Sequence, residues 1–160
     1  VVFLEHKRTY RLVRGEVPDE EYTLPIGRAD IKREGNDISV ITYGLMVHHC
    51  LEAAQAVAGQ GIEVEVLDLR TVRPIDNKAI VQTAMKTGKV LIVHEDSKAL
   101  GVGAEVSAIV SEHAFEYLDG PVARLAGPEV PAMPFSPLME AMYMIDSDKI
   151  AKAIRKLAEY

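Results

Sequence analysis

Ile38-Ser39-Val40-Ile41-Thr42-Tyr43 opens the part of the chain that decides the fold, since β-branched residues dominate it and Gly44 ends it, as in a β-strand. A helical pattern follows over Val47–Ala58, with apolar residues spaced so that one face is buried. Gly59-Gln60-Gly61 ends that helix, and Glu63-Val64-Glu65-Val66-Leu67-Asp68-Leu69 then alternates as a second strand does.

The alternation of strand and helix continues through the rest of the chain. Asp76 is expected to cap a helix that runs to Lys86 and is closed by Thr87-Gly88. The remaining predicted elements are an apolar strand over 89–93, a helix over 103–117, a strand over 121–125, a proline-rich loop over 128–137 and an amphipathic helix over about 146–159. Such alternation with short connections predicts a three-layer α/β/α fold with a mostly parallel sheet.

Residues 1–36 differ from the rest and are expected to form a separate part, so we divide the chain into 1–36 and 37–160. Val1-Val2-Phe3-Leu4-Glu5 lacks Met and has the pattern of a buried strand, from which we expect a piece of a longer protein. A basic block over 6–14 and an acidic, proline-bearing block over 15–21 show no apolar period and indicate an extended linker. The basic block is also a candidate anion patch, although a solvated surface is the favoured interpretation.

Composition narrows the classes of function. The 160 residues are 48% hydrophobic and 26% charged, as in ordinary globular proteins. A net charge of −6 and the absence of Trp argue against nucleic-acid binding as the main role. The apolar runs are too short to span a bilayer, so no membrane contact is expected. No signal peptide is seen at residue 1, and we expect a cytoplasmic location, or the mitochondrial matrix in a eukaryote.

Two motifs suggest ligands but have plainer interpretations. Gly101-Val102-Gly103-Ala104-Glu105-Val106 follows a strand and opens a helix, as a dinucleotide fingerprint does, but Val106 stands where a small residue is needed. A tight turn is the favoured interpretation.

His48-His49-Cys50 contains adjacent helical residues, which point about 100° apart and cannot chelate one ion. Cys50 is the only cysteine, so an intrachain disulfide is excluded and no metal site is expected.

His94-Glu95-Asp96 lies at the carboxyl end of the most apolar strand, where ligands bind in open parallel sheets. General acid–base chemistry by His94 or Glu95 is one interpretation. The other, which we favour, is a structural role in capping the next loop, because no nucleophile can be placed beside them from the sequence.

Three segments together resemble a known family. Asp68-Leu69-Arg70-Thr71-Val72-Arg73-Pro74-Ile75-Asp76 resembles the motif that opens the second helix in the carboxyl-terminal domain of the transketolase family. Together with residues 44–54 and 86–95, this motif resembles the beta subunit of the thiamine-diphosphate-dependent 2-oxo acid dehydrogenases. Residues 3–11 are similar to the end of that subunit's pyrimidine-binding domain, and 22–29 are similar to its interdomain linker. The segment 132–146 is more similar to branched-chain (2-oxoisovalerate) members than to pyruvate members.

The resemblance implies a tetramer of two alpha and two beta subunits that decarboxylates a 2-oxo acid and passes the acyl unit to a lipoyl group. It also implies thiamine diphosphate with magnesium, held between the alpha subunit and the beta subunit's amino-terminal domain. The catalytic carboxylate and histidine of the family belong to that domain, which we expect upstream of Val1. We therefore expect no catalytic, cofactor-binding or metal-binding residue in this segment.

The resemblance further implies that the carboxyl-terminal domain packs beta on beta and receives the peripheral subunit-binding domain of the dihydrolipoyl acyltransferase. Asp119 and the Tyr160 terminus match the family's acidic docking elements by position. A turn residue before Gly120-Pro121 is an equal interpretation of Asp119. Arg70 and Arg73 are expected to be free to pair with carboxylates, including those of another subunit.

Two alternatives stay open. One is the matching domain of another thiamine enzyme, such as transketolase or deoxyxylulose phosphate synthase. The other is a free-standing doubly wound ligand-binding or regulatory domain. Under the leading interpretation, residues 2–4 and a face with Met139, Met142 and Met144 leave apolar area uncovered, which predicts self-association.

Overall fold

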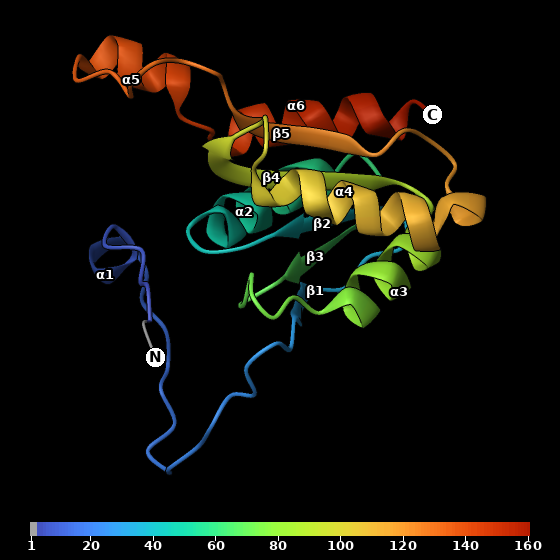
Figure 1. Cartoon of the computed structure of the whole chain (residues 1–160), viewed down its shortest axis with the longest axis horizontal. Coiled ribbons are helices and arrows are strands. Elements are labelled where there is room, and N and C mark those ends of the chain that lie inside the picture. The colour runs from blue at the N-terminus through green and yellow to red at the C-terminus, as the bar shows by residue number, and fades with distance from the viewer. Residues whose placement is uncertain (1–2) are drawn as a thin grey trace.

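A five-stranded sheet forms the centre of the computed structural model, which describes residues 3–160 (Figure 1). The strands are β1 (Asp30–Arg33), β2 (Ile38–Thr42), β3 (Val64–Asp68), β4 (Val90–Ser97) and β5 (Ala123–Gly127), in the order β1-β3-β2-β4-β5. Strands β2 to β5 are parallel, and β1 pairs antiparallel with β3 at one edge. The mostly parallel sheet confirms the predicted fold class.

Helices cover both faces of this sheet. The helices within residues 3–160 are α1 (Thr9–Leu12), α2 (Met46–Ala58), α3 (Asn77–Thr87), α4 (Val102–His113), a 3-10 turn (Phe115–Tyr117), α5 (Pro137–Tyr143) and α6 (Ser147–Ala158). Those that cover the sheet are α2, α3, α4 and α6, whereas α1 and α5 stand away from it (Figure 1). One core cluster joins α2 and α6 to side chains such as Val64 and Val66, and a second joins α3 and α4 to Leu67 and Ile92. Along β2, β3 and β4, neighbouring apolar side chains such as Val66 and Leu67 therefore enter different cores, as the alternation of side chains along a strand requires.

The motif at 68–76 organises the chain around the start of α3. Asp76 caps that helix by accepting from the backbone N–H of Ala79 (3.1 Å), which confirms the predicted cap. The other oxygen of Asp76 accepts from the N–H of Ala29 (3.0 Å), and the Thr71 hydroxyl accepts from that of Gly27 (3.2 Å). These contacts hold the residues that lead into β1.

Some elements differ from the expected ones. β1 lies inside the segment expected to be linker, and α5 lies in the connection to the last helix. β4 continues beyond Val93 to Ser97, and the helix expected over 103–117 ends at His113. Phe3 and Leu4 are exposed and lie in no strand, whereas Val1 and Val2 lie outside the described residues. The division at residue 36 stays a prediction.

None of the helices within residues 3–160 is long and apolar enough to cross a membrane.

Candidate functional site

Asp119 and Tyr160, two of the four expected partner-binding residues, lie together at the amino ends of the parallel strands. The backbone N–H of Asp119 donates to the carbonyl of Gly88 (2.8 Å) at the end of α3. A Cβ on Gly88 would lie 2.3 Å from Oδ2 of Asp119, and one on Gly120 would lie 3.2 Å from the Cβ of Tyr160. The two glycines thus allow Asp119 and the Tyr160 ring to approach, and both side chains are exposed.

Two hollows flank this pair. A polar hollow of about 420 Å³ is lined by Asp119, Lys89 and Asp37, among others, and a mostly apolar one of about 260 Å³ lies between β5 and α6 against Tyr160. Lys89 is held by donation from its Nζ to the carbonyl of Ala158 (3.3 Å). A carboxylate and an aromatic ring beside these hollows can bind a partner that carries both cationic and apolar side chains.

Arg70 and Arg73 follow β3 at the opposite end of the sheet, so the four expected residues do not form one site. Arg70 Nη2 lies 2.6 Å from the Asp30 carboxylate on β1. A hydrogen bond from Lys32, together with the Arg70 charge, holds the pKa of Asp30 below its ordinary value. Arg70 is therefore engaged within its own chain rather than free, whereas Arg73 is exposed.

His94 is buried in β4 beneath the first turn of α4, and neither ring nitrogen has a hydrogen-bond partner among residues 3–160. A Cβ on Gly103 would lie 2.4 Å from Nε2 of His94, and one on Gly101 would lie 2.8 Å from its Cε1. The Tyr43 ring stacks at a centroid distance of 6.3 Å. The glycines thus allow close packing on an imidazole, and His94 supports the loop by shape rather than by a hydrogen bond.

Burial makes His94 a source of acid sensitivity. Desolvation lowers the pKa of the ring in the folded state, and the Asp96 charge only partly opposes this. Below about pH 6.5 the unfolded chain binds a proton that the folded chain excludes, so the free energy of unfolding should fall by up to about 1.4 kcal/mol per pH unit. Urea unfolding at pH 7.0 and 5.5 measures this fall, which His94→Gln should reduce and His113→Gln, on an exposed residue, should leave intact. An unchanged pH dependence in His94→Gln would refute the assignment.

Glu95 and Asp96 line a crevice of about 450 Å³ between the ends of β2 and β4. This crevice lies at the end of the sheet that also holds Arg70. Glu95 Oε2 pairs with Nε2 of His6 at 2.9 Å, so the N-terminal segment closes part of this crevice. Among residues 3–160, no Ser, Thr or Cys lines it. The structure therefore gives acid–base catalysis by His94 or Glu95 no neighbouring nucleophile within the crevice.

The histidine pair on α2 does not form a chelate. His49 lies 3.5 Å from the carboxylate of Glu52, and no group of three potential metal-binding side chains occurs within the described part of the chain. Cys50 is fully buried, and burial raises the pKa of its thiol to about 12, so the thiolate that reactive chemistry needs is suppressed.

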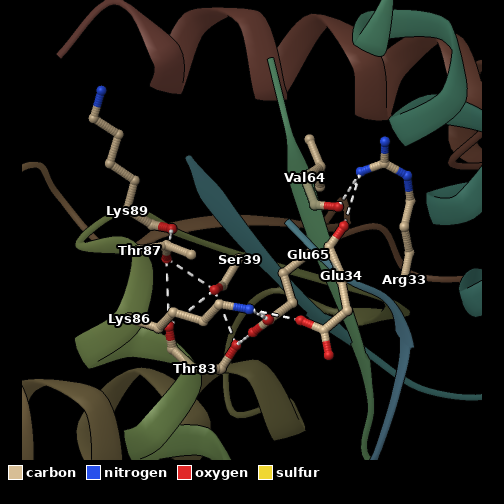
Figure 2. A network of polar contacts seen from close by, with 9 residues as sticks. All are labelled: Arg33, Glu34, Ser39, Val64, Glu65, Thr83, Lys86, Thr87 and Lys89. Atoms are coloured by element: carbon tan, nitrogen blue, oxygen red, sulfur yellow. Dashed lines mark hydrogen bonds and ion pairs between the residues drawn. The ribbon is translucent and has the colours of Figure 1, made fainter. Parts of the chain in front are cut away.

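A buried polar network centred on Glu65 was not expected from the sequence (Figure 2). Glu65 on β3 is almost fully buried, and its carboxylate accepts from the Thr83 hydroxyl and from Nζ of Lys86. Lys86 also binds Glu34 at 2.7 Å, which helps raise the pKa of its ammonium. The Ser39 hydroxyl bonds those of Thr83 (2.9 Å) and Thr87 (2.8 Å). The network fastens α3 to β2 and β3, and through Glu34 to the residue that follows β1.

The order of the strands and the helices on both faces define the class of doubly wound α/β domains. Within this class, the family described as "Transketolase, C-terminal domain" matches residues 27–150. The chain belongs to this family.

The relatives found by sequence include beta subunits of 2-oxo acid dehydrogenases. The 2-oxoisovalerate dehydrogenase subunit beta of Bacillus subtilis is 56% identical over 160 residues, which are 100% of this chain and 49% of that protein. The pyruvate dehydrogenase E1 component subunit beta of the same organism is 44% identical with the same coverage. The chain therefore spans about half the length of these relatives, and it is more similar to the 2-oxoisovalerate relative, as the segment 132–146 had indicated.

A solved structure supports the fold. The structure titled "Split gene transketolase, inactive beta4 tetramer" superposes with a TM-score of 0.77 and 26% identity, covering 91% of this chain and 46% of that one.

Proposed function

We propose that this chain serves in the beta subunit of a 2-oxo acid dehydrogenase that acts on branched-chain 2-oxo acids. The observation that carries the proposal is the 56% identity with a 2-oxoisovalerate dehydrogenase beta subunit over all 160 residues. In the intact enzyme, thiamine diphosphate with magnesium supports decarboxylation, and the acyl unit passes to a lipoyl group. An alpha subunit is the second component of that enzyme, and the cytoplasm is its proposed location.

Cofactor contacts are not assigned to this chain. Residues 3–160 contain no group of three side chains suited to a metal ion, and the glycines at 101 and 103 are occupied by packing on His94. We propose that the residues of this chain take no part in holding the magnesium-bound diphosphate. The role proposed for this domain is assembly.

Docking of the acyltransferase is proposed at Asp119 and Tyr160. Support comes from the exposure of both side chains, their approach across Gly120 and the two hollows beside them. The partner is the peripheral subunit-binding domain of the dihydrolipoyl acyltransferase, presenting a basic surface to a chain of net charge −6. Arg73, at the other end of the sheet, is proposed to meet carboxylates of another subunit.

Titration of this chain with that binding domain tests the docking site. Asp119→Asn should weaken binding about tenfold, because it removes one charge-assisted contact. Binding by the unchanged chain should weaken as salt rises from 50 to 500 mM, since salt screens the attraction. Asp19→Asn, an equal change of charge on an exposed residue of the N-terminal segment, should bind as the unchanged chain does.

Two results would count against the proposal. Binding that is insensitive to salt and equal in the two variants would move the docking site away from Asp119. If the folded chain does not bind the partner at 100 µM, the docking function is refuted and only the family and the fold of the chain stay supported.

A further inference from the structure

The crevice between the ends of β2 and β4, which we call the switch-point crevice, has a special place in the topology of the sheet. β2 leads through α2 to β3 on one side, whereas β4 lies on the other side of β2. The direction in which successive strands are added therefore reverses between β2 and β4. In open α/β sheets, ligands bind outside the carboxyl ends of the strands at such a point. The topology thus marks this crevice as the place for a small ligand.

The charged side chains that line the switch-point crevice are mostly negative. Its carboxylates belong to Glu95 and Asp96 on β4 and to Glu5 in the N-terminal segment. Among residues 3–160, only Arg70 adds a guanidinium to this lining, and that group is already paired with a carboxylate of β1. The lining therefore keeps two negative charges when His6 is neutral.

Apolar walls lie beside these carboxylates and are formed by Leu4, Val72 and the ring of Tyr43. Desolvation raises the pKa of the Tyr43 hydroxyl, and the charges of Asp96 and Glu95 raise it further, since a negative potential disfavours the phenolate. An aromatic ring in such a potential attracts organic cations. Because no group of three side chains suited to a metal ion occurs within residues 3–160, an organic cation fits the crevice better than a metal ion does.

A basic group of the chain itself already lies in the crevice. Nε2 of His6 is 2.9 Å from Oε2 of Glu95, so a nitrogen donor can reach this carboxylate. Within the described residues 3–160, no hydrogen bond or ion pair joins residues 7–26 to residues 27–160. Few contacts therefore hold the N-terminal segment at the crevice, and a ligand with a permanent positive charge can displace His6 from Glu95.

We propose that the switch-point crevice binds an aliphatic diamine or polyamine, with ammonium groups at Glu95 and Asp96 and methylene groups against Tyr43 and Val72. Two ammonium groups match the two negative charges of the lining, and His6 is the internal competitor for Glu95. Butane-1,4-diamine has as many non-hydrogen atoms as benzene. A cavity of about 150 Å³ takes up benzene, so a crevice of about 450 Å³ has room for the diamine. This inference goes beyond the proposed assembly function and does not depend on it.

Titration of the isotope-labelled chain with butane-1,4-diamine, followed by amide chemical shifts, tests the site. We expect saturable shifts at Tyr43, Gly44 and Asp96. The diamine should bind about tenfold more tightly than butylammonium at equal ionic strength, because its second ammonium group meets a second carboxylate. Glu95→Gln should weaken binding of the diamine about tenfold for the same reason. Glu112→Gln is the matched control, since it removes an exposed carboxylate at the far end of α4.

His6→Ala tests the competition for Glu95. Removal of the imidazole should tighten diamine binding about threefold, the amount expected from a partly exposed ion pair. The amide spectrum shows whether each variant is folded, and Asp96→Asn, on an exposed residue, gives the same test should Glu95→Gln not fold. Equal binding of butylammonium and the diamine would overturn the proposal. Weaker binding in His6→Ala, or an equal loss in Glu112→Gln and Glu95→Gln, would overturn it as well.

Discussion

Lys86→Met should lower the free energy of unfolding by about 3 kcal/mol, because it leaves the carboxylate of Glu65 buried without its cation. Removing one partner of a buried ion pair costs about 3–5 kcal/mol. The lower end applies here because the Lys86 side chain is about one third exposed and the Thr83 hydroxyl still donates to Glu65. Thermal or urea unfolding followed by circular dichroism measures the change.

Two further variants separate the ion pair from the helix. Lys78→Met changes an exposed lysine on the same helix and should alter stability by less than about 0.5 kcal/mol. Glu65→Gln combined with Lys86→Met should recover part of the loss, because the buried group is then neutral. If the double variant is as unstable as Lys86→Met alone, the loss comes from the aliphatic part of the lysine and not from its charge.

The Glu65 network shows where prediction from the sequence ends. The alternation over 63–69 correctly indicated a strand, and alternation normally places polar residues toward water. Here the polar position enters the second core, because helix α3 covers that face as well. The sequence signal was available in Ser39, Thr83, Thr87 and Lys86, but only the fold places them together.

The edge strand β1 was missed for a related reason. Asp30-Ile31-Lys32-Arg33 is short and only partly buried, so it carries neither the alternation of a half-buried strand nor the apolar run of a central one. Its position depends on tertiary contacts, such as those of Asp76 with Ala29 and of Arg70 with Asp30. By contrast, β2 and the α3 cap were predicted because burial and capping leave local patterns.

The candidate site was predictable only in part. Resemblance to the family singled out Asp119 and Tyr160, and the turn at 68–76 suggested Arg70 and Arg73, but positions along a sequence do not say which end of a sheet each residue occupies. The structure brings the first two together and places the other two at the far end. Docking at Asp119 therefore stays a prediction that the titration tests.

Gly103→Ala should destabilise the chain by about 2–3 kcal/mol, although alanine normally favours a helix over glycine by about 1 kcal/mol. The added methyl group would lie 2.4 Å from Nε2 and 2.7 Å from Cδ2 of His94, and 3.2 Å from Cγ2 of Ile92. The imidazole has little room to move, since Gly101 and the Tyr43 ring hold it on other sides. Overpacking of this kind costs about 1–3 kcal/mol or more. Urea unfolding at pH 7 measures the loss.

A double-mutant cycle with His94→Ala assigns the cause. In the His94→Ala background the new methyl group meets a space instead of a ring, so Gly103→Ala should be neutral or stabilising by about 1 kcal/mol. The coupling between the two positions would then be about 3 kcal/mol, the size expected for side chains in direct contact. If Gly103→Ala costs the same in both backgrounds, the glycine serves the backbone of the turn itself. In that case the turn, and not the buried histidine beneath it, requires the glycines of Gly101-Val102-Gly103.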